Sequence, residues 1–205
     1  MMERPMTPRL ARPLYRGALI AALPLLLAGC ISFGEEPPPY LLSLTPTSVV
    51  ADGATASGPS AGAITVLTPE IPQKLSTPRV PVQSTATQIA YVEGAQWVDT
   101  PHRLFRRLLS ETIAARTGRL VLDEGQAITD PGTRLVGELI DFDVDASASD
   151  VVVTYDATLV TGETASKRRF QARVPIAAVE PIQVGTALNA AANEVAGEVA
   201  AWIGG

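Results

Sequence analysis

The sequence is poor in the residues from which many active sites are built. Its 205 residues include one cysteine, Cys30, and one histidine, His102. Zinc sites of the Cys₄ or Cys₂His₂ type are therefore excluded, an intrachain disulfide is impossible, and a Ser-His-Asp or Cys-His mechanism would have to use His102. The chain also lacks a G-x-S-x-G motif, a glycine-rich phosphate loop and an H-E-x-x-H motif. These absences favour a protein that is not an enzyme and that needs no cofactor or metal.

Basic residues are scarce after the first 29 positions. The chain holds 16 Lys and Arg against 21 Asp and Glu, a net charge of −5, and residues 1–29 contain four Arg and one Glu. The remainder has 12 basic and 20 acidic residues, which gives −8. Nucleic acid is an improbable partner for such a chain, because phosphate binding needs a basic surface. The hydrophobic content of 46% suits one globular domain of medium size.

Residues 1–29 are typical of a secretory signal peptide. An apolar run covers residues 17–27 and is followed by small residues. Eleven helical residues span only about 16 Å, roughly half of the hydrocarbon core of a bilayer, so the run is too short for a stable transmembrane helix. The basic start of the segment is formed by Arg4, Arg9, Arg12 and Arg16.

The end of this segment predicts a lipid anchor. Leu27, Ala28, Gly29 and Cys30 resemble a bacterial lipobox. The resemblance implies diacylglycerol on the Cys30 thiol, cleavage before Cys30 and acylation of the new N-terminus; the alternative is an ordinary signal peptide that happens to precede a cysteine. Two or three acyl chains anchor a protein stably, whereas one binds marginally. Ile31, in place of Asp, resembles the default signal for the outer membrane. We expect a periplasmic protein tethered there, with the inner membrane as the less favoured alternative.

Residues 30–62 are expected to connect the lipidated cysteine to the folded domain. Residues 35–39, Glu-Glu-Pro-Pro-Pro, predict a stiff charged spacer. Residues 40–44 are a short strand candidate that belongs with the domain. Residues 45–62 are rich in Ser, Thr, Gly and Ala and predict a mobile loop.

Residues 63–205 predict an α+β domain. Thr100 and Pro101 are typical of a helix start, apolar residues then recur at three- and four-residue spacing, and Gly118 ends the helix. A second, alanine-rich helix is predicted at about 183–203. The proline-punctuated stretch around 69–81 predicts loop with short edge strands. Since the alternating strands have one apolar face each, we expect an antiparallel meander with both helices packed on one face. The predicted strands are 63–67, 88–92, 120–123, 134–145, 151–161 and 166–174.

An acidic cluster on one of these strands offers the best candidate for a metal site. Asp141, Asp143 and Asp145 alternate with apolar residues. An EF-hand would need glycine and glutamate where Ala146 and Val152 stand. The alternation instead predicts the solvated face of a strand.

Two basic clusters and a tryptophan are the candidates for a partner or lipid surface. In an acidic protein, basic clusters can face anionic headgroups or an acidic partner, or they can be solvated faces paired with Asp and Glu, the interpretation we favour. Trp97 precedes the first helix and is expected either to staple it or to form an exposed contact. The clusters are Arg103, Arg106 and Arg107 on the first helix, and Lys167, Arg168 and Arg169 on the last strand.

The order and spacing of these segments resemble the ABC-type transport auxiliary lipoproteins, the family that includes the lipoprotein encoded with paraquat-inducible proteins. The resemblance covers about residues 30–203. It is carried by Cys30, Tyr40-Leu41-Leu42-Ser43-Leu44, Ile64-Thr65-Val66, Pro69, Ile71-Pro72, Leu75-Ser76-Thr77-Pro78-Arg79-Val80, Gln96-Trp97-Val98-Asp99-Thr100-Pro101 and Ala200-Ala201-Trp202-Ile203.

This resemblance implies a non-catalytic accessory subunit of an envelope ABC system that carries lipid. Its partners would be an MCE-domain periplasmic protein and, through it, a permease and an ATPase, together with outer-membrane lipids; a homo-oligomer is possible. The candidate surface for these partners is Trp97 with the first arginine cluster. The alternative function is a lipoprotein that assists or plugs an outer-membrane β-barrel, and the two hypotheses are separated by the partner.

Overall fold

The computed structural model describes residues 38–58, 62–126 and 132–204. The chain divides into two compact units at Pro37 and Pro38, and the described fold belongs to the second. The signal-peptide motif at Leu27, Ala28 and Gly29, the lipidation site at Cys30 and most of the proline-rich spacer lie outside these residues.

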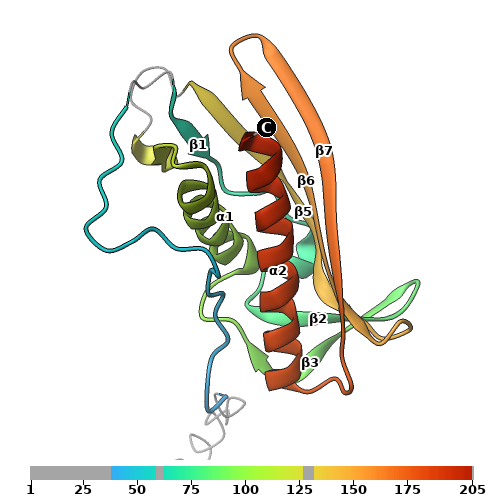
Figure 1. Ribbon diagram of the computed structural model, residues 1–205. Coiled ribbons are helices and arrows are strands. Elements are labelled where there is room, and N and C mark those ends of the chain that lie inside the picture. Colours follow the sequence, from blue (N-terminus) through green and yellow to red (C-terminus); the bar gives the residue numbers. More distant parts are fainter. Residues whose placement is uncertain (1–37, 59–61, 127–131, 205) are drawn as a thin grey trace, which may run out of the picture. The chain divides into compact units, whose positions relative to one another are not determined.

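A long central strand organises the seven-stranded sheet (Figure 1). β5 (Thr133–Asp145) pairs along its length with β6 (Asp150–Thr161), and β6 pairs with β7 (Thr164–Pro175). Both pairings are antiparallel, as predicted for these three strands. A bulge between Leu139 and Asp141 leaves Ile140 without a partner on β6.

The other edge of β5 is shared by two smaller pairs of strands. β1 (Ile64–Val66) runs parallel to the start of β5 and carries β4 (Val121–Leu122), also parallel. β2 (Arg79–Thr85) runs parallel to the end of β5 and carries β3 (Gln88–Gln96), which is antiparallel to β2. The sheet is therefore mixed, and the prediction of a purely antiparallel meander is wrong. Alternation reports which side chains are buried, not the direction of the neighbouring strand.

β2 also departs from the sequence prediction. It lies between β3 and β5, although it contains Pro81, which has no backbone donor. The strand tolerates the proline because its pairing with β5 begins only at Val82 and Gln83. The proline-rich stretch is thus not confined to edges.

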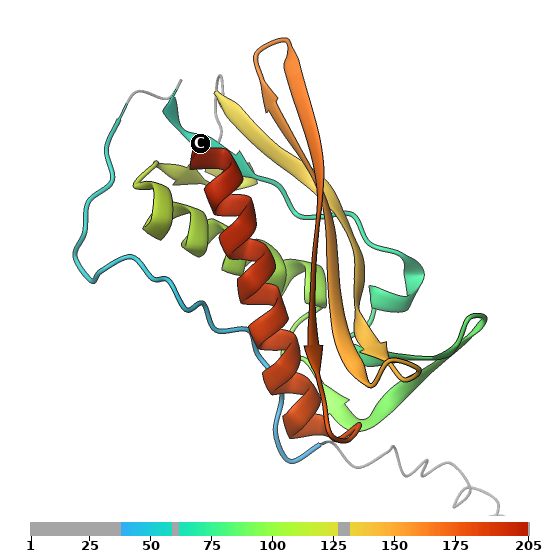
Figure 2. The same ribbon diagram turned by 45° about the vertical axis from the view of Figure 1, so that its right-hand side comes forward.

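The two helices lie on one face of the sheet, as predicted (Figures 1 and 2). α1 (Pro101–Thr117) begins with its proline and ends at Gly118, whose φ of 66° is left-handed. The ring of Phe105 on α1 meets Tyr155 on β6 at 5.3 Å between centroids. α2 (Pro181–Gly204) places Trp202 5.6 Å from Phe170 of β7. Tyr155 and Phe170 are partners across the strands, so both helices cover the same side.

Residues 45–58 are not the free loop that their composition predicted. The backbone N–H groups of Thr45 and Thr47 donate to the side-chain oxygens of Asn189 and Asn193 on α2, at 2.8 and 2.7 Å. Further along, the N–H of Val50 donates to Glu111 of α1 at 2.7 Å. The first part of the segment is thus fixed to both helices by polar side chains. Figure 2 shows the path of its backbone, in blue. Composition could not reveal this, because the bonding partners are distant in sequence.

Candidate functional site

The three arginines predicted as a partner surface share the solvent side of α1. Arg103 and Arg107 are exposed, and Arg106 is half-buried. Their spacing of three and four residues places them on one helical face, opposite the buried stripe that includes Leu104 and Leu108. The use of this face as a partner surface stays a prediction.

A shallow hollow of about 410 Å³ lies beside this arginine face. Arg106 forms an ion pair with Asp123, which follows β4. Within the described residues, no ion pair is formed by Arg103 or Arg107. The surface therefore offers two charged side chains for an external partner and a third held in place. The hollow is lined by Thr68, Asp99, Arg103, Arg106, Arg107, Asp123, Glu124 and Gly125.

Trp97 is not part of this surface. Its side chain is only 1% exposed and its ring lies 5.4 Å from that of Phe142 on β5. Its backbone joins two neighbouring segments of the chain. The N–H of Trp97 donates to the carbonyl of Pro78 at 2.8 Å, and Trp97 forms a parallel β-bridge with Leu42. The prediction of an exposed contact is wrong, because this large apolar ring is taken into the core where β3 ends.

The second basic cluster divides between the two faces of β7. Arg169 donates to Asp156 on β6 at 2.6 Å, and Lys167 lies 3.3 Å from the same carboxylate. The hydrogen bond from Arg169, then that from Lys167, lowers the pKa of Asp156 against the opposing effect of burial. Arg168 faces the other way, with its guanidinium 4.9 Å from the ring centre of Phe170. The interpretation of paired solvated charges is thus confirmed for Lys167 and Arg169.

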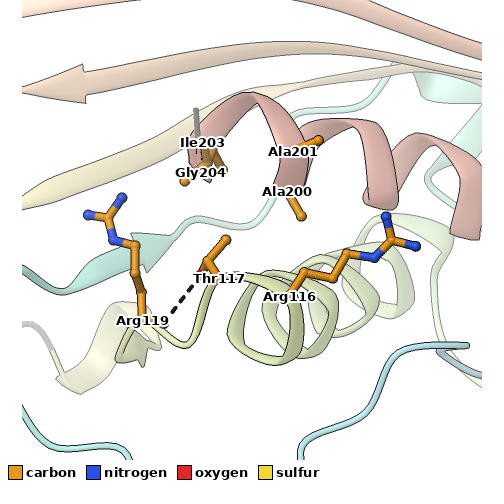
Figure 3. Close-up of a pocket in the computed structure, with 7 residues that line it drawn as sticks. All are labelled: Arg116, Thr117, Arg119, Ala200, Ala201, Ile203 and Gly204. Carbon is orange, nitrogen blue, oxygen red and sulfur yellow. Dashed lines mark hydrogen bonds between the residues drawn. The ribbon is translucent and has the colours of Figure 1, made fainter.

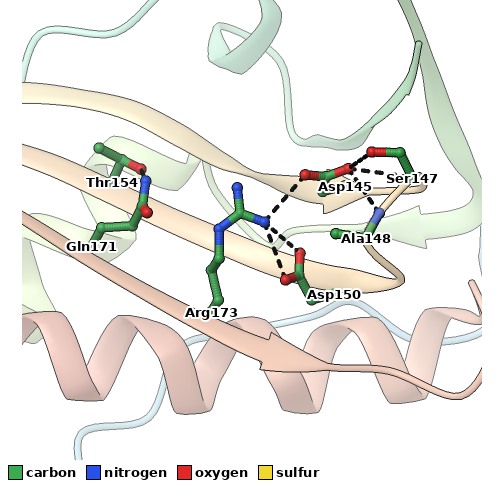
Figure 4. Close-up of polar contacts among 7 residues, drawn as sticks. All are labelled: Asp145, Ser147, Ala148, Asp150, Thr154, Gln171 and Arg173. Atoms are coloured by element: carbon green, nitrogen blue, oxygen red, sulfur yellow. Dashed lines mark hydrogen bonds and ion pairs between the residues drawn. The ribbon is translucent and has the colours of Figure 1, made fainter. Parts of the chain in front are cut away.

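The same ladder continues towards the turn between β5 and β6 (Figure 4). Arg173 donates to Asp145 at 3.1 Å and to Asp150 at 2.9 Å. Hydrogen bonds from Ser147 and then Arg173 lower the pKa of Asp145 to about 2. These pairs join three strands across their polar face.

Within the acidic cluster on β5, Asp143 is buried and not solvated as predicted. The Lys74 ammonium, from the 3₁₀ turn η4 (Gln73–Leu75), lies 2.9 Å from Asp141 and 2.5 Å from Asp143. Burial raises the pKa of Asp143 to about 6, against the opposing effect of Lys74. Burial alone would lower the pKa of Lys74, but its hydrogen bonds to Asp143 and Asp141 raise it. The solvated-face prediction is wrong for Asp143, because alternation could not show that η4 crosses this face.

A second hollow, of about 680 Å³, lies between the C-terminal ends of α1 and α2 (Figure 3). Arg116 packs against α2 so closely that a Cβ on Gly197 would come within 2.7 Å of its guanidinium. Arg119 donates to the carbonyl of Gly62 at 3.1 Å and to the hydroxyl of Thr133 at 3.2 Å. Both arginines thus contribute to packing at this end of the domain.

The described residues present few groups with catalytic potential. His102 is half-buried in the first turn of α1, and burial, followed by the charge of Arg103, lowers its pKa. Within ranges 38–58, 62–126 and 132–204, no three His, Cys, Asp or Glu side chains are grouped as a metal ion would require. Neither described helix combines the length and hydropathy needed to cross a membrane.

The sequence profile of the ABC-type transport auxiliary lipoprotein component matches residues 40–200. The chain belongs to this family. Sequence comparison with the curated proteins gives no match for this auxiliary lipoprotein.

Two solved structures share the fold of the auxiliary lipoprotein. One uncharacterised protein is 13% identical, with a TM-score of 0.63, over 80% of this chain and 99% of its own. Protein XCC0632 from Xanthomonas campestris, of family DUF330, is 17% identical, with a TM-score of 0.59, over 81% of this chain and 92% of its own. These similarities support the fold of the auxiliary lipoprotein.

Proposed function

We propose that this auxiliary lipoprotein is the outer-membrane-anchored, non-catalytic subunit of an MCE-type ABC system that transports lipid. The observation that carries the proposal is the family match over residues 40–200, beginning ten positions after the only cysteine of the chain, Cys30, in its lipobox. Membership of a family of transport auxiliary components favours a role as an accessory subunit over a catalytic one.

The mechanism is non-covalent. Acyl chains on Cys30 hold the protein on the inner leaflet of the outer membrane. The proline-rich spacer limits how far the domain can lie from the membrane. Arg103 and Arg107, exposed beside the Arg106–Asp123 pair, engage an acidic surface of the MCE-domain protein. That protein in turn contacts the permease and the ATPase.

The test is the identity of what co-purifies with the full-length protein. A tag follows the C-terminus, which lies at the end of the domain opposite the beginning of the blue segment (Figure 1). Envelopes are extracted with a mild detergent and the captured proteins are identified by mass spectrometry. The proposal expects an MCE-domain protein, with or without its permease and ATPase. Recovery of an outer-membrane β-barrel instead would support the assembly hypothesis and overturn the transport one.

A matched variant isolates the role of the anchor. Cys30→Ser removes the acyl acceptor without touching the domain. We expect the variant to leave the outer-membrane fraction and to lose incorporation of labelled palmitate. Unchanged fractionation with palmitate absent would contradict anchoring through Cys30.

A further inference from the structure

Exposed apolar side chains gather where the tether joins the domain. Of the eight large hydrophobic residues exposed among the described residues, five belong to three segments at this end: Tyr40, Leu41, Val98, Val179 and Ile182. We refer to these five as the apolar end patch. Their exposed fractions lie between 41% and 65%.

A hollow lined by two of these segments, and a hydrogen bond from the third, show that the segments lie side by side. Tyr40, Leu41 and Ile182 line one hollow of about 310 Å³. The N–H of Val98 donates to the carbonyl of Leu42 at 2.8 Å, which places Val98 beside the same stretch. Leu42 itself turns inward: a Cβ on Gly185 of α2 would come within 2.6 Å of its side chain. Figures 1 and 2 both place the start of α2 beside the beginning of the blue segment, at the end opposite the C-terminus.

The tether keeps this patch close to lipid. Tyr40 follows Cys30 by ten residues, so even a fully extended chain holds it within about 36 Å of the acylated cysteine. A short link of this kind gives an effective concentration on the order of millimolar, which makes even a weak surface contact persistent. Tyr40 combines an apolar ring with a polar hydroxyl, the combination favoured at bilayer interfaces.

The negative net charge of the domain indicates that contact between the patch and a bilayer is hydrophobic and not electrostatic. The chain after residue 29 carries a net charge of −8, so attraction to anionic headgroups does not draw the domain as a whole to a bilayer. In the stretch 179–182 the charged residue is Glu180, whose carboxylate accepts from Gln183 at 3.3 Å. Val179 and Ile182 remain exposed on either side of it.

We infer that the apolar end patch rests on the lipid surface into which Cys30 inserts, so that the domain stands on the membrane with α2 beginning at the bilayer. This inference rests on the anchoring of Cys30 in the proposed function. It assigns the patch to lipid, and it leaves the arginine face of α1 for the protein partner.

The test uses the lipidated mature protein in vesicles of phosphatidylethanolamine and phosphatidylglycerol. Because the Cys30 thiol carries the lipid, Val179→Cys supplies the only free thiol for an environment-sensitive fluorophore. The matched control is Glu163→Cys, an exposed position in the turn between β6 and β7. We expect the label at position 179 to shift to the blue and to be quenched by brominated lipid at any salt concentration. The label at 163 should behave as in water.

A second pair of variants checks that the apolar side chains cause the contact. Leu41→Lys with Ile182→Lys should abolish the quenching at 179. Val49→Lys with Ile89→Lys changes two comparably exposed apolar residues outside the patch and should leave it unchanged. Circular dichroism confirms that each variant is folded.

Three outcomes would overturn the inference. Water-like emission at 179 in a lipidated protein would show that the patch does not touch the bilayer. A blue shift without quenching by brominated lipid would show that protein, such as a second copy of the chain, covers the patch. A mature protein that mass spectrometry finds without acyl groups would overturn both the inference and the anchor in the proposed function.

Discussion

The amide of Thr47 donates a 2.7 Å hydrogen bond to the side-chain oxygen of Asn193, 146 residues further along the chain. The side-chain amide nitrogen of Asn193 donates to the carbonyl of Thr45 at 2.9 Å. Asn193 thus acts as a polar clamp between α2 and the chain that arrives from the tether. It is a buried polar residue on an otherwise apolar helical face, 7% exposed.

Asn193→Ala is expected to release this clamp. The carbonyl of Thr45 and the N–H of Thr47 then lose their partner, which should lower the free energy of unfolding by about 1–3 kcal/mol. Amide hydrogen exchange should show a larger loss of protection at Thr47 than at Leu67, whose N–H donates to Leu135 inside the domain. Equal protection of Thr47 in the variant and the wild type would contradict the clamp.

Trp97→Ala is expected to destabilise the fold, because the ring is buried against Phe142. Removing a large aromatic side chain from a core costs about 3–5 kcal/mol. Denaturant unfolding followed by circular dichroism measures the loss. A variant with unchanged stability but weakened partner binding would instead place the ring in an interface, against the present assignment.

Gly137 is expected to tolerate no side chain. A Cβ there would lie 2.2 Å from the carbonyl oxygen of Asp156 and 2.7 Å from the Tyr155 hydroxyl. Gly137→Ala should therefore lower the free energy of unfolding by about 1–3 kcal/mol or more. Gly125→Ala, with no atom within 4 Å of the new Cβ, is the control and should change the free energy of unfolding by less than about 0.5 kcal/mol. Equal effects of the two changes would refute the close approach of β5 and β6.

The raised pKa of Asp143 predicts that the protein becomes less stable as pH rises through a defined range. Its pKa of about 6 in the folded protein exceeds the ordinary 3.8. Between these values the folded state holds a proton that the unfolded state has lost, so its contribution to stability falls as pH rises through the window. The free energy of unfolding should fall by about 3 kcal/mol in total between the two pKa values.

The measurement is chemical unfolding of the wild type and of Asp143→Asn between about pH 4 and about pH 7, a range that extends beyond the upper limit of that window. The variant cannot titrate at this position, and Lys74 keeps its contact with Asp141 at 2.9 Å. We expect the wild type to lose stability relative to the variant as pH rises. A constant difference between the two proteins, or a wild type that gains, would show that Lys74 and not burial dominates the pKa of Asp143.

Local pattern was enough to predict much of the fold. The apolar spacing of α1, its initial Pro101 and its terminal Gly118 are all read within about one helix length. The strict alternation in β5, β6 and β7 likewise predicted the strands, and the short turns between them predicted their antiparallel pairing. What these elements share is that their determinants are close together in sequence.

The rest depended on contacts between distant residues. The parallel pairing of β1 with β5 joins residues about seventy positions apart, such as Ile64 with Thr133. Lys74 covers Asp143 from 69 positions away. The burial of Trp97 and the clamp at Asn193 also depend on residues distant in sequence, so local composition does not predict them. The arginine face of α1 was visible because it follows helical spacing, whereas the apolar end patch was not, because three separate segments form it.

The central claim concerns the protein that this lipoprotein contacts, and photo-crosslinking in intact cells tests it most directly. A photoreactive amino acid in place of the exposed Arg107 reports which molecule touches the arginine face, and the same substitution at Glu163 is the control. The account predicts a covalent adduct between position 107 and an MCE-domain protein, and none with that protein from position 163. An adduct of position 107 with an outer-membrane β-barrel, or no adduct at all, would contradict it.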